Sequence, residues 1–292
     1  MASLKEVKGR IATVNNTRKI TSAMKMVASA KLHKAQGAIT NMLPYERRLH
    51  GLLTNLLGGS EVLVWNTPRE VKRVALVVFS SNSSLCGGFN ANVIKHATQW
   101  LDEYQALGKD NILIYPVGKK VADALSKMGY AIQGNFQHLA DKPSFAEAAE
   151  LAQGLMNLFT RGEVDRVELL YNHFKSTASQ ILSREAYLPM TAQNCHSEQS
   201  EESRVHPQEV DYILEPSREE LLATLLPKVL RMKLYTVLLD SNASEHAART
   251  MAMQIATDNA DDLLQELTLM YNKTRQQAIT NELLDIVGGS MA

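Results

Sequence analysis

Residues 228–287 read KVLRMKLYTVLLDSNASEHAARTMAMQIATDNADDLLQELTLMYNKTRQQAITNELLDIV and contain neither glycine nor proline. As a single α-helix, this run of about sixty residues would be about 90 Å long. Helices in globular domains average about 11 to 12 residues, so one this long needs a partner helix or a partner protein along its length. Ser217 and Glu220 form a capping box before the run, and Gly288-Gly289 follow it. We therefore expect one helix over about 218–287, with a kink at Pro227.

The amino-terminal end of the chain carries the same kind of signal. Ser3 and Glu6 form a second capping box, and no glycine or proline occurs between Gly9 and Gly37, which predicts a helix over about 3–57. Because the rest of the chain lies between these two helices, they must run antiparallel. Near their base, two sets of leucines are expected to meet, namely Leu52, Leu53, Leu56 and Leu57 with Leu221, Leu222, Leu225 and Leu226.

The two helices differ from a regular coiled coil. A strict heptad fails, because the phase that starts at Ile11 and Val14 leads to the polar Arg18 and Thr21, whereas apolar residues at 20, 24 and 27 keep a different phase. Either the coiled coil is imperfect or the apolar residues outside the seam touch other proteins. Small side chains at helical spacing would let the axes approach closely: Ala23, Ala28, Ala30 and Ala35, with Ala243, Ala247, Ala248, Ala252, Ala256 and Ala260.

The middle of the chain alternates between strand and helix patterns. Strands are predicted at 74–79, 111–117, 166–174 and 180–188, and helices at 90–107, 119–128 and 145–159. The predicted fold class is α/β, a long antiparallel coiled coil of the terminal helices with an inserted Rossmann-like α/β layer domain. The expected division is 1–58, 72–212 and 217–292, with a linker at 60–72 and a flexible polar loop at 193–209.

The carboxyl-terminal helix is predicted to be longer than its partner by about 15 residues, or about 22 Å. Its last turns would then extend past the first helix. They carry an apolar set that would be exposed, Ile279, Leu283, Leu284, Ile286 and Val287. Exposed apolar surface of this kind indicates a binding surface.

Composition narrows the class of protein. No apolar stretch reaches the 18 or so residues that cross a bilayer, and the amino terminus lacks the apolar core of a secretory signal. Cys86 and Cys195, the two cysteines, form no disulfide framework and fit a reducing compartment. The net charge is zero, yet residues 1–50 hold ten Lys or Arg and two acids. Either the charges of the two paired helices are complementary, or an acidic partner protein faces the following basic residues: Arg10, Arg18, Lys19, Lys25, Lys31 and Lys34. Nucleic acid is disfavoured, because no aromatic residues are interleaved with these cations.

The best candidate for chemistry is the turn SSNSSLCGGFN, residues 80–90, which follows a buried strand and precedes a helix. Phosphate-binding loops occupy that place in α/β proteins. The turn matches neither G-x-G-x-x-G nor G-x-x-x-x-G-K-[ST], so a structural turn in which glycines allow a close approach is favoured over nucleotide binding. Cys86 has no activating neighbour in sequence, and the acids at 258, 261 and 262 fit a solvated helix face. His173 and His246 fit packing or surface positions. We expect no catalytic, metal-binding or cofactor-binding residues.

Four segments resemble the gamma subunits of F-type ATP synthases: LKEVKGRIATVNNTRKITSAMKMVASAKLHKAQ (4–36), SSLCGGFN (83–90), SNASEHAARTMAMQIATDNADDLL (241–264) and YNKTRQQAITNELLDIVGG (271–289). The resemblance implies a non-catalytic rotor shaft that couples proton flow to ATP synthesis or hydrolysis. It implies a coiled coil inside a ring of three alpha and three beta subunits, and an α/β domain near the epsilon subunit and the membrane c-ring. The implied location is peripheral, on the cytoplasmic face of a bacterial inner membrane, with no cofactor, no nucleic acid and no direct membrane insertion.

The resemblance also implies roles for individual residues. The set Lys19, Ile20, Thr21, Met24, Lys25, Met26 and Val27 matches the part that faces the acidic lever loop of a beta subunit. Arg275 and Gln276 match the positions that bind the catch loop of an open beta subunit, and 279–287 match the tip that turns in a hydrophobic sleeve. Leu85, Cys86, Gly87 and Gly88 match the central turn.

Two features depart from the family pattern. Asn82, Ser83 and Ser84 replace an acid, a base and a glycine of the family turn, and Cys195 stands alone where plastid relatives carry a cysteine pair. A dithiol switch is therefore not expected, and the bacterial type fits best. Two other interpretations remain at this point. A free-standing coiled-coil scaffold would form a homodimer that covers the tip, and a nucleotide-dependent α/β enzyme would bind phosphate at the central turn.

Overall fold

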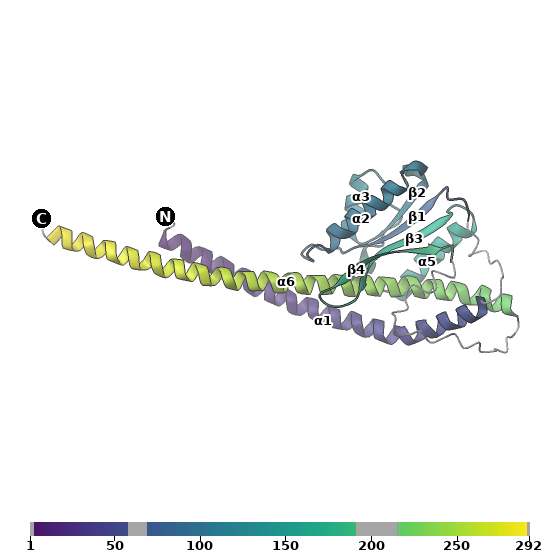
Figure 1. Ribbon diagram of the computed structural model, residues 1–292, viewed down its shortest axis with the longest axis horizontal. Helices are drawn as coiled ribbons and strands as arrows, with labels where there is room; N and C mark the ends of the chain where they lie inside the picture. Colours follow the sequence, from purple (N-terminus) through teal and green to yellow (C-terminus); the bar gives the residue numbers. More distant parts are fainter. Residues whose placement is uncertain (1–2, 58–68, 191–214, 216, 291–292) are drawn as a thin grey trace.

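The computed structural model describes residues 3–57, 69–190, 215 and 217–290. Two long helices, α1 (Leu4–Leu57) and α6 (Arg218–Ser290), lie side by side in opposite directions and form a shaft (Figure 1). An α/β layer lies against the amino-terminal half of α6, and the carboxyl-terminal end of α6 extends past the start of α1 (Figure 1). This arrangement confirms the predicted fold class. The loop predicted at 193–209 lies outside the described residues, as does most of the linker predicted at 60–72.

The layer is built on a four-stranded sheet with the order β2-β1-β3-β4. Its strands are β1 (Val74–Phe79), β2 (Ile112–Val117), β3 (Arg166–Phe174) and β4 (Gln180–Leu188). The central strand β1 is parallel to β2 and β3, and β4 is antiparallel to β3. All six residues of β1 are buried, because helices cover both faces of the sheet. This explains the continuous apolar run that the sequence shows there.

The two faces of the sheet carry different helices. One face packs against α2 (Phe89–Glu103) and α3 (Lys119–Lys127), and the other packs against α5 (Phe145–Thr160) and α6. A five-residue helix, α4 (Gln137–Asp141), was not predicted. The helix predicted at 90–107 ends at Glu103 and continues as two short 3₁₀ turns, η1 (Gln105–Leu107) and η2 (Lys109–Asn111). Gly108, between these turns, has a φ of 82°, which breaks the helical path.

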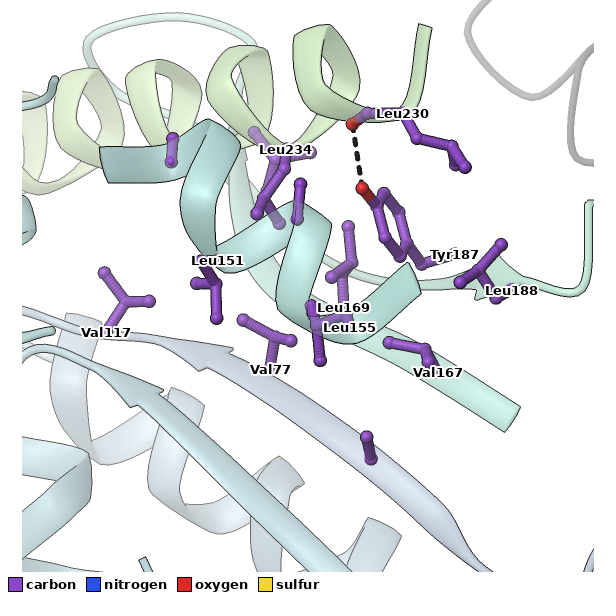
Figure 2. Packing of buried hydrophobic residues seen from close by; sticks show 14 of the residues in the cluster. Val77, Val117, Leu151, Leu155, Val167, Leu169, Tyr187, Leu188, Leu230 and Leu234 are labelled. Carbon is purple, nitrogen blue, oxygen red and sulfur yellow. Dashed lines mark hydrogen bonds between the residues drawn. The ribbon is translucent and has the colours of Figure 1, made fainter. Parts of the chain in front are cut away.

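The core between the sheet and α6 joins the layer to the shaft (Figure 2). Leu230 and Leu234 of α6 are buried in the same cluster as Val77 of β1 and Leu155 of α5. The Tyr187 hydroxyl of β4 donates to the Leu230 carbonyl oxygen at 2.9 Å (Figure 2). Therefore α6 is both half of the shaft and one wall of the core of the layer.

Polar contacts also fix α6 against the sheet. Asp240 accepts a hydrogen bond from the Phe174 backbone N–H at 2.7 Å. Two and four residues further on, Asn242 donates to the Ala140 carbonyl oxygen at 2.7 Å, and Ser244 donates to the Asn172 carbonyl oxygen at 2.8 Å. Because these groups are buried or partly buried, each lost bond would leave a desolvated polar atom. Sliding or turning α6 against the layer is therefore costly.

The ends of the two long helices partly match the sequence prediction. The Ser3 hydroxyl accepts from the Glu6 backbone N–H, and the Ser217 hydroxyl accepts from the Glu220 backbone N–H, each at 3.2 Å, so both predicted caps are confirmed. The predicted end at 287 is wrong, because α6 continues through Gly288-Gly289 to Ser290. Glycine permits a helix end but does not force one. With 73 residues in α6 and 54 in α1, the difference is 19 residues rather than about 15.

Candidate contact surfaces of the helical shaft

The seam between the helices keeps a single heptad phase along α1. Its positions, each buried or half-buried, recur at alternate spacings of three and four: Leu4, Val7, Ile11, Val14, Arg18, Thr21, Lys25, Ala28, Leu32 and Ala35. The predicted failure of the heptad is therefore wrong. Arg18 and Thr21 belong to the seam because α6 supplies polar partners for both. Arg18 Nη1 lies 2.7 Å from Asp261 Oδ1, and Thr21 Oγ1 lies 2.9 Å from Thr257 Oγ1.

The same phase decides which small and apolar residues lie inside the shaft. Leu32 and Ala35 pack against Ala243 and Ala247, whereas Ala23 and Ala30 are exposed, so they do not belong to the close seam that was predicted. At the base, the leucine cluster is formed by Leu49, Leu53, Leu56, Leu222, Leu226 and Val229. Leu52 lies outside this cluster and is 39% exposed, because it falls between seam positions.

The α1 outer surface, defined as Lys19, Ile20, Met24, Lys25, Met26 and Val27, holds most of the residues predicted to face a beta-subunit lever loop. Its four apolar side chains are 42–66% exposed. Lys19 is exposed beside them, and Lys25, which also occupies a seam position, is half-buried at the edge of this surface. Thr21, which was expected in this set, is buried in the seam instead. A cluster of exposed apolar side chains flanked by lysines fits a partner that is partly apolar and acidic.

Two of the six basic residues that were expected to face an acidic partner have acidic partners within the chain. Arg10 pairs with Glu6 at 2.7 Å, and Arg18 pairs with Asp261. The Arg18 pair joins the two helices, as the first interpretation requires, whereas the Arg10 pair lies within α1. The second interpretation, an acidic partner protein, stays a prediction. Part of the charge serves helix pairing, and part lies on the outer surface of α1.

The overhang, defined as residues 275–290, is the part of α6 beyond the start of α1. Because the helices are antiparallel, the numbers of two residues that face each other across the seam have a nearly constant sum. The sum is 278 for Thr21 with Thr257 and 279 for Arg18 with Asp261. By this register Leu4 lies level with Thr274 and Arg275, so about 24 Å of helix projects alone (Figure 1). Arg275 and Gln276 are exposed at its root. The five predicted apolar tip residues, Ile279, Leu283, Leu284, Ile286 and Val287, are 48–68% exposed.

A further apolar set on α6 was missed by sequence reasoning. Its members are 36–71% exposed and lie along the paired part of the helix: Met251, Ile255, Leu263, Leu269 and Met270. The signal that could have found them is the heptad phase. Once the seam is traced through Met253, Ala260 and Leu267, all five apolar residues fall outside it. The shaft therefore exposes apolar side chains on both of its helices.

The central turn, residues 80–90, lies between β1 and α2 as predicted. Its polar groups bind neighbouring parts of the same chain. The Asn82 side-chain amide donates to the Gln137 carbonyl oxygen at 2.7 Å, and its oxygen accepts from the Lys119 backbone N–H at 2.9 Å. The Ser83 hydroxyl accepts from Arg249 of α6 at 2.8 Å. Thus two of the three residues that depart from the family turn now join it to α3, α4 and α6.

The predicted turn residues Leu85, Cys86, Gly87 and Gly88 differ in their surroundings: Cys86 is packed inside and Gly87 lies close to α6, whereas Leu85 is exposed. Gly87 has a φ of 58°, and the position of a Cβ added there would lie 3.8 Å from the Ala252 side chain, so α6 is the segment that approaches this turn. Cys86 is buried, with its Sγ 3.1 Å from Asn90 Nδ2. Leu85 is 60% exposed with a φ of 69°, a left-handed conformation that is unfavourable for leucine. The turn acts as a connector between the layer and the shaft.

Two titratable side chains are buried on α6 beside this connector. Burial, together with the positive charges of Arg249 and Lys31, lowers the pKa of His246 to about 4. His246 is therefore neutral at pH 7. Burial raises the pKa of Glu245, while Arg249, whose Nη1 lies 2.5 Å from the carboxylate, opposes that shift. Both residues lie inside the packed contact, as expected for His246.

Two kinds of feature are absent from the residues that the structure describes, a metal-binding cluster and a membrane-spanning helix. Among these residues, no group of three or more His, Cys, Asp or Glu side chains could hold a metal ion. Within the same ranges, no helix combines the length and apolar character needed to cross a bilayer.

The chain forms a shaft of two helices of unequal length, and an α/β layer is fixed to the longer helix. Exposed apolar side chains lie along both helices. These features define an axle-like subunit. The family model described as ATP synthase matches residues 3–292. The chain is 68% identical to the ATP synthase gamma chain of Phocaeicola vulgatus and 63% identical to that of Bacteroides fragilis, each over the full length of both proteins. The chain belongs to the ATP synthase gamma chain family.

Solved structures show the same fold at low identity. The chain matches one from the Euglena gracilis mitochondrial ATP synthase, OSCP/F1/c-ring in rotational state 3, with a TM-score of 0.64 and 20% identity, over 99% of this chain and 93% of that one. It also matches one from the central stalk and c-ring structure of the Tetrahymena thermophila mitochondrial ATP synthase, with a TM-score of 0.56 and 23% identity, over 81% and 99%.

Proposed function

We propose that this chain is the central rotor shaft of an F-type ATP synthase, without catalytic activity of its own. It couples proton flow through the membrane sector to ATP synthesis or hydrolysis in a head of three alpha and three beta subunits. The observation that carries the proposal is the overhang, in which five apolar side chains are 48–68% exposed on a lone helix. Such a tip calls for a surrounding protein, and membership of the gamma chain family supports the alpha and beta head as that protein.

Each contact surface then has an assigned partner. The α1 outer surface meets the acidic lever loop of a beta subunit. Arg275 and Gln276 bind the catch loop of an open beta subunit, where the planar guanidinium can engage a carboxylate through two hydrogen bonds. The apolar tip turns in a hydrophobic sleeve at the top of the head. The α/β layer faces the epsilon subunit and the c-ring, which holds the chain peripherally at the cytoplasmic face of a bacterial inner membrane.

The contacts between α6 and the layer support a role in passing torque. Rotation imposed on the layer reaches α6 through buried side chains and through the hydrogen bonds of Asp240, Asn242 and Ser244. The shaft is asymmetric, because lysines flank the outer surface of α1 whereas Asp258, Asp262 and Glu266 lie among the exposed apolar residues of α6. Three identical beta subunits around it therefore meet different surfaces, and these differential contacts favour a different conformation in each.

The assigned catch can be tested by charge reversal. In the assembled complex, we expect Arg275→Glu to lower ATP hydrolysis and ATP synthesis about tenfold or more, because a charge-assisted pair becomes a repulsion. Lys273→Glu is the matched control, since it makes the same charge change on an exposed side chain two residues away, and it should retain most of the activity. Equal activity of wild type and Arg275→Glu would remove Arg275 from the catch.

The stoichiometry of the native complex tests the wider proposal. Native mass measurement should find one copy of this chain with three copies each of two larger chains. A stable homodimer with salt-dependent DNA binding would instead favour a free-standing scaffold. Nucleotide binding by the isolated chain that is lost on substitution in the central turn would favour an enzyme.

A further inference from the structure

The axial register of α1 against α6 determines how far the overhang projects. Because α6 is fixed to the layer, register depends on where α1 sits along it. Most seam positions on α1 cannot fix this register by themselves, because they are apolar, from Leu4 to Val14 and from Ala28 to Ala35. In a heptad seam, a slide of seven residues places apolar residues opposite apolar residues again. Such a slide would move the helices by about 10 Å.

Two polar pairs interrupt this apolar seam at one level. Arg18 pairs with Asp261, and both side chains are about half exposed. One turn along, Thr21 is 9% exposed and contacts Thr257 hydroxyl to hydroxyl. Each threonine hydroxyl also lies within hydrogen-bond distance of its own helix, Thr21 at the Arg18 carbonyl and Thr257 at the Met253 carbonyl. Two protons serve three contacts, so one hydroxyl donates across the seam and the other donates to its own helix.

Neither pair alone singles out the observed register, but the two together do. If α6 slides seven residues toward the tip, Thr21 meets Thr250 and its hydrogen bond can form again, but Asp261 is then level with Ile11. If α6 slides seven residues the other way, Asp261 meets Lys25 and an ion pair can form again, but Thr21 is then level with Leu264. Each slide keeps one pair and places a polar group of the other against an aliphatic side chain, which is unfavourable.

We propose that the Arg18–Asp261 and Thr21–Thr257 pairs act together as a register lock for α1 on α6. Polar seam residues are known to fix the register of coiled coils even where they add little stability. The lock sets the length of the overhang, and its importance for the position of the tip in the head rests on the proposed rotor function. The lock itself is a property of the single chain and can be tested without the complex.

The test is a distance measurement between two spin labels on the purified full-length chain. Thr13→Cys on α1 and Asn281→Cys on the overhang are both exposed and lie about 23 Å apart along the axis by the observed register. Cys195→Ser removes a competing thiol, and Cys86 is buried. Double electron–electron resonance on this background should give a single distance population. Helical circular dichroism confirms that each variant is folded.

The direction of the slide is the sharp prediction. Arg18→Leu with Asp261→Leu leaves the threonine pair and removes the polar group that would meet Ile11, so a second population about 10 Å longer should appear. Thr21→Val with Thr257→Val leaves the acid, which can pair with Lys25, so a second population about 10 Å shorter should appear. The four substitutions together should give both. Thr17→Val with Thr268→Val removes two exposed hydroxyls outside the seam and should leave one distance.

A charge swap provides the rescue. Arg18→Asp with Asp261→Arg restores the ion pair in the observed register, but in the shorter register it places the introduced guanidinium of α6 against Lys25. Added to Thr21→Val and Thr257→Val, the swap should therefore restore a single distance. If the variant that lacks both pairs, without the charge swap, keeps one unchanged distance, the register is set elsewhere, by the leucine cluster at the base, and the lock is refuted. New populations that the charge swap leaves in place would refute it as well.

Discussion

His246 shows how one buried side chain links this fold to pH. It occupies a buried position on α6, and its Nδ1 has no hydrogen-bond partner within the described structure. Because burial lowers its pKa to about 4 from an ordinary value near 6.5, the unfolded chain takes up this proton first as pH falls. Stability from this residue is complete above about pH 6.5 and is lost progressively between 6.5 and 4.

We expect His246→Leu to flatten the fall of the melting temperature between pH 6.5 and 4. If the whole pKa shift of His246 appeared in the free energy of unfolding, it would contribute about 3 kcal/mol. Solvent screening should reduce this contribution to about 1 to 2 kcal/mol. The pKa of Glu245 is raised, so its contribution has the opposite sign, but both proteins retain it. Thermal melts of wild type and His246→Leu across this range isolate the histidine. Parallel pH profiles of the two would show that His246 is solvated in solution.

At the scale of elements, the heptad phase of α1 determines which of two neighbouring leucines is buried against α6 and which is exposed. Leu53 is fully buried in the leucine cluster, whereas its neighbour Leu52 is 39% exposed. Leu53→Ala should lower the free energy of unfolding by about 2 to 5 kcal/mol, through lost burial and the cavity left behind. Leu52→Ala, the same chemical change one residue away, should cost under about 1 kcal/mol. Urea unfolding of both variants decides the point, and equal costs would mean that the seam phase at the base is misassigned.

The same phase explains what the sequence could and could not predict about the elements. The strands at 74–79, 166–174 and 180–188 match β1, β3 and β4, because alternating or continuous apolar runs bounded by polar turns are local signals. The seam was misjudged at Arg18 and Thr21, because a polar residue at a core position is permitted when the partner helix supplies Asp261 and Thr257. That information lies more than 230 residues away in the chain. Local periodicity cannot reveal it.

At the scale of the whole molecule, the unequal lengths of α1 and α6 follow from the sequence, because breaker-free runs and capping boxes mark both helices. The way the layer holds the shaft does not follow. It depends on contacts such as Arg249 with Ser83 and Tyr187 with the Leu230 carbonyl, which the fold alone brings together. The exposed tip was predictable because the amino-terminal helix is too short to pair with the whole of the carboxyl-terminal helix. The exposed residues Met251 and Ile255 were not, because their exposure depends on the seam phase.

The tip provides a test in which stability and assembly should separate. Leu283→Ser, Leu284→Ser and Ile286→Ser remove apolar side chains that are 57–68% exposed in the chain. The free chain should therefore melt within a degree or two of wild type, since exposed substitutions rarely change stability by more than about 0.5 kcal/mol. The proposed function has the head bury these side chains in the complex, and on that proposal each would contribute about 1.5 to 3 kcal/mol to assembly.

We therefore expect the triple variant to reduce recovery of the intact complex more than tenfold, measured by native mass or gel filtration after reconstitution. The control changes the polar residues interleaved with the tip, Thr280→Ser, Glu282→Gln and Asp285→Asn, which are also exposed and should leave assembly near the wild-type level. Because the free-chain melts are measured in parallel, a loss of assembly cannot be attributed to misfolding. Full assembly of the triple variant would mean that the overhang projects into solvent, and the sleeve contact would have to be abandoned while the family assignment stands.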